Sequence, residues 1–378
     1  MQLLPTLLTT LIALQGPPAP AKKPQAPTWL KPLMEQALKS DAASKGNRSE
    51  ADFDISATFA YYGMKSEAKA CLDHAKKLNG GSAGGWNYYL PRELGLLVMN
   101  ERPDSVIRAI RGTFGDGPEA ESPRSEAYFW AGIYSGMKGD AEGVVSIVRA
   151  SEGSSMQVNT IISSSLHLMD RNDRSGVVKA LNLIPASGLD RFTTSDFYRL
   201  VIRCGQKDDV LGAIASETDP KEKLSQQKAI VHALAKMSLK KELLAIVDGT
   251  KDNETKAEAY YALSSISLRM KNLKEASAYI AKGDIFATLA PKSQSYLDRV
   301  ALRVEVEVDQ AAAMKRLKRM PDDYQMPAGL ATIAGWQLSK GDLKGAQATL
   351  AARPKFLPQA VALMFVSQMT TGSPKQSG

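Results

Sequence analysis

The sequence predicts an all-α protein, an α-solenoid of about nine stacked helix-turn-helix hairpins with capping helices at its N- and C-terminal ends. Two observations predict this class. A small or apolar residue returns about every 33 residues, after a turn-like cluster and at the start of an apolar helical stripe. No stretch sustains the period-two alternation of a strand. The repeated positions, which are 33 to 38 residues apart, are Ala68, Val106, Val144, Val177, Val210, Leu243, Ala276, Ala313 and Ala346.

Composition is consistent with one folded chain of 378 residues. Apolar residues make up 44% and charged residues 23%, which is typical of globular proteins and not of disordered ones. Because each hairpin needs only its neighbours, the unbroken period predicts a single solenoid domain over residues 29–370. No stretch carries the ~18 consecutive apolar residues of a membrane span, so we do not expect a membrane-spanning protein.

The net charge of +8 is unevenly placed, and residues 292–378 carry 12 basic and 7 acidic side chains. This bias favours an anionic partner. No run of Lys and Arg is interleaved with exposed aromatic residues, so nucleic acid is not an expected partner.

The N-terminus resembles a targeting segment. Leu3 to Leu14 is mostly apolar and is followed by Ala19-Pro20-Ala21, a small-x-small cleavage pattern. We therefore expect a signal peptide over residues 1–21, a proline-rich linker over 22–28 and an exported protein, periplasmic or extracellular. A disordered tail or an initiating helix is the alternative. Residues 371–378 are predicted to be a disordered tail.

Individual hairpins can be assigned from the same pattern. Trp29 to Leu38 is predicted to be a capping helix. In the clearest hairpin, helices over Lys256–Met270 and Leu273–Lys282 flank the turn Lys271-Asn272. In the last hairpin, Gly329–Ser339 and Leu343–Ala352 flank Lys340-Gly341-Asp342.

Turn residues delimit these helices. Gly at a hinge supports a left-handed helix C-cap, and Asp or Asn supplies an N-cap acceptor for the next helix. Prolines follow the predicted second helices, where they end a helix without breaking it: Pro185, Pro220, Pro291, Pro321 and Pro354. Two longer spacings predict insertions at Leu78–Asn87 and Gly112–Pro123.

These hairpins resemble tetratricopeptide repeats over roughly Ser49 to Arg353. The residues that carry the resemblance are Gly63 with Ala68, Leu72 and Ala75; Asn272 with Ala276 and Ile280; and Gly341-Asp342 with Ala346 and Leu350. HEAT-like hairpins are the alternative, and the 33-residue period favours the tetratricopeptide family.

The resemblance implies that first helices line a concave groove which binds a protein or peptide. Lys228, His232 and Lys236 are spaced by four and form one stripe on a helix face, where a bound anion would relieve their mutual repulsion. The alternative is a solvated face whose cations pair with Asp196 or Glu258. Fixed offsets from the repeated positions predict these groove residues: Arg199, Arg203, Lys228, His232, Lys236, Tyr261, Arg269 and Arg299.

A second basic cluster surrounds the predicted core residue Leu317. Lys315, Arg316, Lys318 and Arg319 are predicted to face outward, either toward an anionic polymer or surface or simply into solvent near a helix C-terminus. An anionic polymer of the cell envelope is therefore a further candidate partner.

Other residue types indicate packing. Cys71 and Cys204, about four repeats apart, are expected to be unpaired and buried. The three histidines, His74, His167 and His232, fall in different hairpins without metal-ligand spacing, so neither a metal nor a cofactor is expected. Phe129, Trp130 and Tyr134 are expected in the core, with Trp130 facing the groove as the alternative.

Together these features predict a non-catalytic, exported interaction scaffold. No nucleophile, phosphate-loop or metalloprotease motif occurs in the chain. The alternative function is an enzyme, or a subunit of an enzyme complex in the cell envelope, with an active site that the sequence does not reveal.

Overall fold

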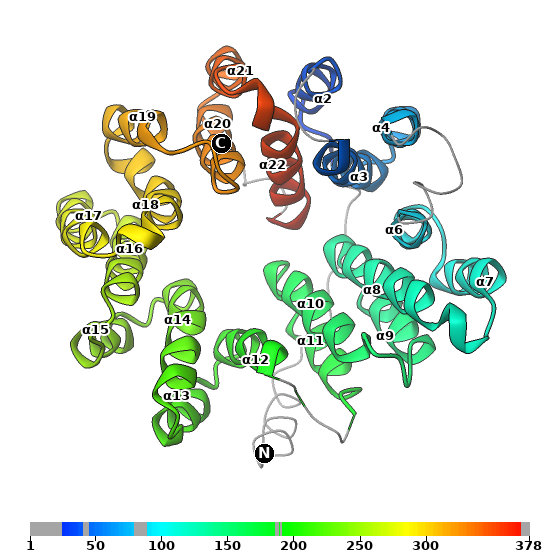
Figure 1. Cartoon of the computed structure of the whole chain (residues 1–378), viewed down its shortest axis with the longest axis horizontal. Coiled ribbons are helices and arrows are strands. Elements are labelled where there is room, and N and C mark those ends of the chain that lie inside the picture. Colours follow the sequence, from blue (N-terminus) through cyan, green and yellow to red (C-terminus); the bar gives the residue numbers. More distant parts are fainter. Residues whose placement is uncertain (1–24, 41–44, 79–88, 186–188, 190, 372–378) are drawn as a thin grey trace. The chain divides into compact units, whose positions relative to one another are not determined.

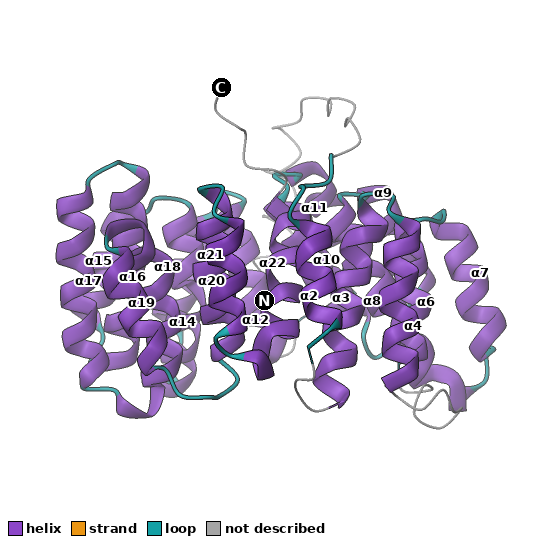
Figure 2. Ribbon diagram, turned by 90° about the horizontal axis from the view of Figure 1, so that it is seen from above, coloured by secondary structure: helices purple, strands orange, loops and turns teal. Residues whose placement is uncertain are grey.

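The computed structural model describes residues 25–40, 45–78, 89–185, 189 and 191–371 (Figure 1). Within these ranges the regular structure is helical and contains no strand (Figure 2), which confirms the all-α class. The predicted signal peptide, residues 22–24 of the linker, residues 372–378 of the tail and nearly all of the insertion Leu78–Asn87 lie outside the described residues. No helix among those described combines the length and the apolarity that crossing a membrane requires.

The α-helices begin and end as follows, in chain order: α2 (Leu30–Leu38), α3 (Lys45–Tyr61), α4 (Lys65–Leu78), α6 (Leu90–Leu96), α7 (Pro103–Phe114), α8 (Glu121–Lys138), α9 (Ala141–Ala150), α10 (Gln157–Asp170), α11 (Arg174–Leu181), α12 (Arg191–Arg203), α13 (Lys207–Ser216), α14 (Pro220–Lys236), α15 (Lys240–Gly249), α16 (Asn253–Arg269), α17 (Leu273–Thr288), α18 (Gln294–Val308), α19 (Gln310–Arg319), α20 (Met326–Ser339), α21 (Leu343–Ala351) and α22 (Leu357–Thr371). Short 3-10 turns occur at Leu97–Met99, Pro118–Ala120, Pro291–Ser293 and Pro354–Phe356.

Most helices are packed in consecutive pairs. First helices contact the second helix that follows them, as α3 contacts α4, α8 contacts α9, α16 contacts α17 and α18 contacts α19. First helices also contact the first helix of the next pair, as in α8 with α10 and in α14, α16, α18 and α20 in succession. Each pair therefore buries its apolar side against its neighbours.

The repeated small or apolar residues occupy one structural position. All nine are the fourth residue of a second helix, from Ala68 in α4 to Ala346 in α21, and all nine are buried. At the fourth position a side chain points back over the first helical turn, toward the preceding helix. The sequence period thus reports where each second helix begins.

A common hinge explains why this position is fixed. A residue with positive φ lies five residues before the repeated position at seven hinges: Gly63, Gly139, Asn172, Gly205, Ser238, Lys271 and Gly341. At the α16–α17 hinge, Lys271 N–H bonds to Leu268 O (2.9 Å) and Asn272 N–H to Ser267 O (2.8 Å), a Schellman motif. The Asn272 side chain then accepts from Glu275 N–H and caps α17, as predicted.

Several predicted boundaries are wrong. Helices α16 and α20 start at Asn253 and Met326, three residues before the predicted Lys256 and Gly329. Helix α17 continues to Thr288, well past Lys282. The insertion Gly112–Pro123 is mostly helical, because α7 runs to Phe114, a 3-10 turn covers Pro118–Ala120 and α8 starts at Glu121. Pro123 lies in the first turn of α8, where its missing N–H has no intrahelical acceptor to lose.

The chain forms two compact units. Unit 1 contains residues 1–196 and 361–378, and unit 2 contains residues 197–360, so the boundaries fall within α12 and α22. In unit 1, Phe365 of α22 lies 5.7 Å from Trp29 and 5.7 Å from Phe59, ring centroid to ring centroid. Arg171 also donates to Met369 O at 2.6 Å. Unit 1 is therefore built from both ends of the described chain.

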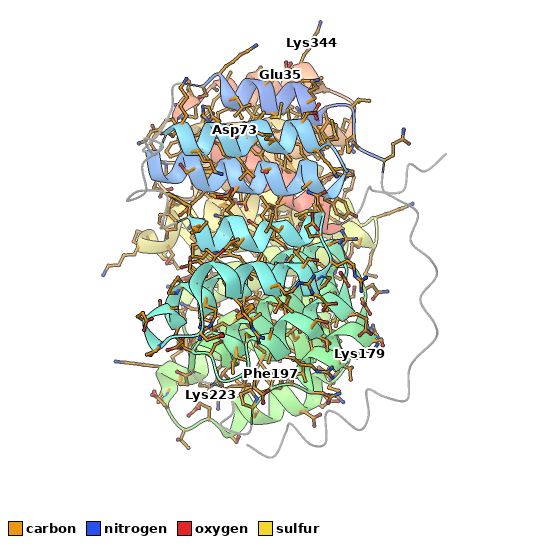
Figure 3. All side chains as sticks on the ribbon, turned by 90° about the vertical axis from the view of Figure 1, so that its right-hand side faces the viewer. Glu35, Asp73, Lys179, Phe197, Lys223 and Lys344 are labelled. Carbon is orange, nitrogen blue, oxygen red and sulfur yellow. The ribbon has the colours of Figure 1, made fainter. Side chains whose placement is uncertain are left out.

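Side chains fill the spaces between neighbouring helices of unit 1 (Figure 3). The contact of α8 with α10 is especially close, because a Cβ on Gly136 would lie 2.5 Å from Ser164 O. Cys71 and Cys204 are both buried and form no disulfide, as predicted.

Candidate binding face

The first helices of unit 2 bring together most of the basic residues that the sequence analysis placed in the groove. We call this surface the basic face. It consists of Arg199 and Arg203 on α12, Lys228, His232 and Lys236 on α14, Arg269 on α16, and Arg299 and Arg303 on α18. Contacts with a neighbouring helix hold Arg199, Lys228, His232 and Arg269 in place.

The cations at the start of the α14 stripe are partly neutralised by α16. Lys228 Nζ lies 3.2 Å from Asp252 and 3.2 Å from Glu254. Although burial opposes its charge, hydrogen bonds to these two carboxylates raise the pKa of Lys228. Lys228 therefore belongs to an ion-pair network and is not an isolated cation.

Glu258 connects three helices beneath the face. Its carboxylate is 3.0 Å from His232 Nε2 and accepts a 2.6 Å hydrogen bond from Tyr296 Oη. Burial opposes ionisation of Glu258, which is 3% exposed, but the contacts with His232 and Tyr296 and the charge of Lys228 together outweigh it, and the pKa of Glu258 is lowered. His232 therefore contacts Glu258, one of the two acids that the predicted alternative pairs with this stripe.

Two predicted arginines bind backbone carbonyls of α14. Arg199 Nε donates to Ala229 O at 2.8 Å, and Arg269 donates to Ala235 O in the last turn of α14. Carbonyls at a helix C-terminus lack intrahelical donors. Arg269 therefore helps to cap α14 and joins it to α16.

Arg299 and Arg303 differ from the other residues of the face. They are one helical turn apart on α18, and within the described residues neither has a hydrogen bond or ion pair to a carboxylate. The Arg299 guanidinium lies 4.9 Å from the Tyr296 ring centroid, and its Nε is buried without an acceptor. Arg303 is exposed at its surface, but desolvation by the surrounding protein, followed by the charge of Arg299, lowers the pKa of Arg303. Two like charges thus lie one helical turn apart without a direct ion pair among the described residues, and the more distant charge of Glu258 favours the charged form of Arg303. The sequence analysis missed Arg303.

Tyr261 does not line the face, contrary to the prediction. It is 1% exposed and packs in the core of α16, α17 and α18. Its hydroxyl donates to Asp284 at 2.8 Å, and Gly283 leaves room for its ring. The fixed offset failed because α16 turns this position toward α17.

Arg316 is not outward-facing either. It is 4% exposed and binds Glu305 (2.6 Å), Asp298 (2.9 Å) and Asp284 (2.9 Å). Arg319 shares Asp298 at 2.9 Å. Arg316 therefore joins α17, α18 and α19, whereas Lys315, Lys318 and Arg319 remain exposed as predicted.

Unit 1 contains a buried arginine among aromatic residues. Arg92, 7% exposed, binds Asp54 at 2.5 Å and Tyr134 Oη at 3.0 Å, and its guanidinium lies 4.0 Å from the Trp130 ring centroid. Burial raises the pKa of Asp54 despite Arg92, and it raises the pKa of Tyr134 to about 12. Tyr134 is in the core as predicted, and the half-buried Trp130 covers Arg92.

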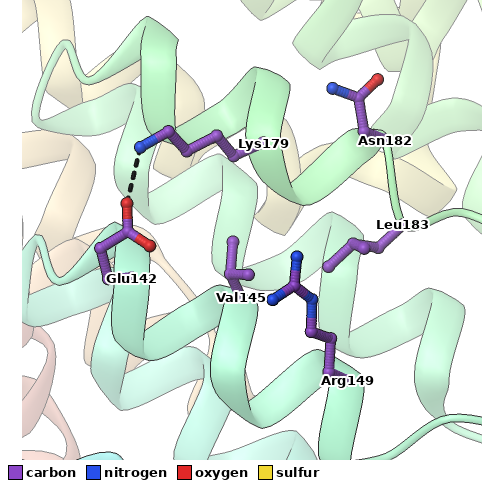
Figure 4. A pocket seen from close by; sticks show the side chains of 6 residues that line it. All are labelled: Glu142, Val145, Arg149, Lys179, Asn182 and Leu183. Atoms are coloured by element: carbon purple, nitrogen blue, oxygen red, sulfur yellow. Dashed lines mark hydrogen bonds and ion pairs between the residues drawn. The ribbon is translucent and has the colours of Figure 1, made fainter.

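The remaining candidates are simpler. His74 Nδ1 lies 2.7 Å from the buried Asp52, and among the described residues no three His, Cys, Asp or Glu side chains are placed to hold a metal ion. A shallow hollow of about 360 Å³ lies between α9 and α11, where Lys179 pairs with Glu142 at 2.6 Å beside Arg149 and Leu183 (Figure 4).

No protein family, curated protein or solved structure matches this chain.

Proposed function

We propose that this protein is a non-catalytic helical-repeat scaffold which binds an anionic protein or peptide segment through the basic face of unit 2. The observation that carries the proposal is the Arg299–Arg303 pair. A carboxylate placed between the two guanidinium groups would supply their missing acceptor and remove their repulsion.

The packing of the helices supports a scaffold of the tetratricopeptide type. The nine repeated positions share one place in their helices, and seven hinges share one backbone geometry. In such solenoids the first helices present a continuous surface to a partner. We also propose that the helix pairs form an α-solenoid and that the N-terminal segment directs export of the protein.

Binding of a labelled acidic peptide, such as oligoglutamate, tests the proposal. Fluorescence anisotropy on the full chain should show binding that weakens as salt is added, because surface charges are screened. The double variant Arg299→Gln, Arg303→Gln should bind at least about a hundredfold more weakly, since each lost charge-assisted hydrogen bond contributes about 1.5–3 kcal/mol.

Matched controls separate the face from overall charge. Lys315→Gln with Lys318→Gln removes the same charge from α19 and should leave peptide affinity within about twofold, as for distant surface substitutions. Circular dichroism should show both variants folded. Equal losses of affinity in the two variants would mean that binding depends on the net charge of the protein and not on the basic face. A wild-type chain without affinity for the acidic peptide would overturn the proposed function.

A further inference from the structure

The second helices α15, α17 and α19 of unit 2 form a surface that the proposed function does not use. They follow one another on the side of unit 2 away from α14, α16 and α18 (Figure 1). Helix α17 lies between the other two. Lys240 of α15 pairs with Glu275 at 2.5 Å, and Arg316 of α19 pairs with Asp284 at 2.9 Å.

Helix α17 and its first hinge expose unusually large apolar side chains. Of the seven large hydrophobic residues that are exposed in the described chain, four lie here: Met270 (69%), Leu273 (54%), Ile285 (61%) and Leu289 (58%). Ile285 and Leu289 are four residues apart and share a helix face. Ala278 and Ala281 are exposed on α17 between the two groups, beside the exposed Lys274 and Lys282, so the solvent side of this helix combines apolar and basic residues.

The charges around these side chains are mainly positive. Exposed lysines occur on all three helices: Lys241, Lys274, Lys282, Lys315 and Lys318. Both acids of α17 are engaged, Glu275 by Lys240 and Asp284 by Arg316. The exposed acids of these helices and their caps are Asp248, near the end of α15, and Asp309, which caps the start of α19.

Stacked aromatic rings pack α17 against α16 next to the exposed residues. Tyr260 of α16 stacks on Tyr279 and Phe286 of α17, with ring centroids 6.2 and 5.7 Å apart. Lys282 extends over both tyrosine rings, at 5.7 and 5.9 Å. Apolar side chains, aromatic rings and long lysines on one helix are the combination found in helices that lie in a membrane interface.

We propose that this surface, formed by α17 with the lysines of α15 and α19, docks on an anionic lipid bilayer. Ile285 and Leu289 enter the headgroup region, and the lysines contact lipid phosphates. A bilayer fits better than a protein partner, because the apolar groups lie at opposite ends of a 16-residue helix with lysines between them. A fluid interface accepts such separated side chains, whereas a stable protein interface needs about 800 Å² of contiguous surface per partner.

Co-sedimentation with vesicles tests the proposal on the full chain. Binding should be strong to vesicles that contain phosphatidylglycerol, weak to phosphatidylcholine alone, and reduced by salt. Lys274→Glu with Lys282→Glu should lower the partition coefficient by at least about tenfold, since each lysine near an anionic surface contributes about fivefold. Ile285→Ser with Leu289→Ser should also lower it, by removing the side chains that insert.

The control is Lys65→Glu with Lys77→Glu, which makes the same charge change at exposed positions of α4 in unit 1 and should bind like the wild type. Absent binding to anionic vesicles, or equal losses in the control, would overturn the proposal. Light scattering on the free protein tests whether a second copy of the chain occupies this surface instead of a bilayer. A dimer that Ile285→Ser with Leu289→Ser dissociates would assign the surface to a second copy instead.

A direct readout of insertion completes the test. Cys71 and Cys204 are buried, so a cysteine introduced as Leu289→Cys can be labelled selectively with an environment-sensitive fluorophore. Its emission should shift to the blue on anionic vesicles. An unshifted emission while the protein co-sediments would overturn the assignment of α17 as the inserting helix. None of these measurements depends on the Arg299–Arg303 pair, so the peptide-binding function and this proposal fail independently.

Discussion

Single residues with a positive φ angle set how tightly the helix pairs turn. Four of the seven hinge positions are glycine, which adopts this conformation without strain. At the others, Asn172, Ser238 and Lys271 carry a side chain in the left-handed region, where the Cβ approaches the following carbonyl. Asn tolerates this geometry, whereas Lys has no local hydrogen bond to offer in return.

Replacing Lys271 with glycine should therefore stabilise the protein. We expect Lys271→Gly to raise the free energy of unfolding by about 0.5–1 kcal/mol, the relief of strain being partly offset by greater freedom of the unfolded chain. Urea unfolding measures it. Gly341→Ala is the converse control, because a Cβ there meets no atom within 4 Å and the effect is that of the backbone alone. It should destabilise by about 1 kcal/mol.

The carboxyl group of Glu258 should make stability depend on pH. Its pKa is lowered in the folded state, so the folded protein binds fewer protons than the unfolded one, in which this group titrates near 4.5. Its contribution is complete above that value and is lost as the pH falls through the folded pKa. The groups that face it are His232, Tyr296 and Lys228.

Comparing the wild type with Glu258→Gln isolates this contribution. The variant should be less stable by about 1–3 kcal/mol at neutral pH, the range for hydrogen bonds to charged groups. Thermal unfolding between neutral pH and pH values below 4.5 should show the difference shrinking as acid is added. A difference that grows in acid would mean that Glu258 titrates in the opposite direction.

At the scale of the helices, the close contact of α8 with α10 leaves no space for a side chain. In Gly136→Ala the new Cβ would lie 2.5 Å from the backbone oxygen of Ser164, which cannot rotate away. We expect a loss of about 1–3 kcal/mol from overpacking. Gly112→Ala in α7 is the matched control. A Cβ there meets nothing within 4 Å, so the better helix propensity of alanine should stabilise by up to about 1 kcal/mol.

Arg316 holds α17, α18 and α19 together. Arg316→Met leaves Asp284, Asp298 and Glu305 without their shared cation, and breaking a buried pair in this way costs about 3–5 kcal/mol. Chemical denaturation measures the loss. Arg319→Met tests the neighbouring position, whose side chain is 56% exposed, and should cost less than about 1 kcal/mol.

The sequence predicts the helices better than it predicts which way their side chains point. The repeated residues are correct because apolar periodicity and hinge chemistry are local signals, and Gly341-Asp342 carries both. The orientations of Tyr261 and Arg316 depend on neighbouring helices, which a fixed offset does not represent. Burial of Arg316 needs carboxylates from α17 and α18, and Asp284 and Asp298 have no sequence relation to Arg316 that would reveal the pairing. Of the Arg299–Arg303 pair, the sequence predicts only Arg299. The hinge between α18 and α19 is shorter than the one between α16 and α17, so the fixed offset from the repeated residue falls on a different position of α18.

At the scale of the molecule, Phe365 should control the stability of unit 1 and not only of its own helix. Phe365→Ala removes a fully buried ring that contacts Trp29 of the chain just before α2 and Phe59 of α3. We expect a loss of about 3–5 kcal/mol. Hydrogen exchange should show faster exchange in α2 and α3, more than 290 residues away in sequence. If protection fell in α22 alone, the packing of Phe365 in unit 1 would be wrong.

The discontinuous makeup of unit 1 has a consequence for how the chain reaches its native state. An open repeat array can fold progressively from its first repeat as the chain emerges. Here α2 and α3 lack Phe365 until the chain has been synthesised through α22. The apolar surface of α2 and α3 that packs against α22 therefore stays uncovered by this chain while unit 2 is synthesised. Natural length variants of this chain should accordingly differ by internal insertion or loss of helix pairs and not by trimming at the C-terminal end.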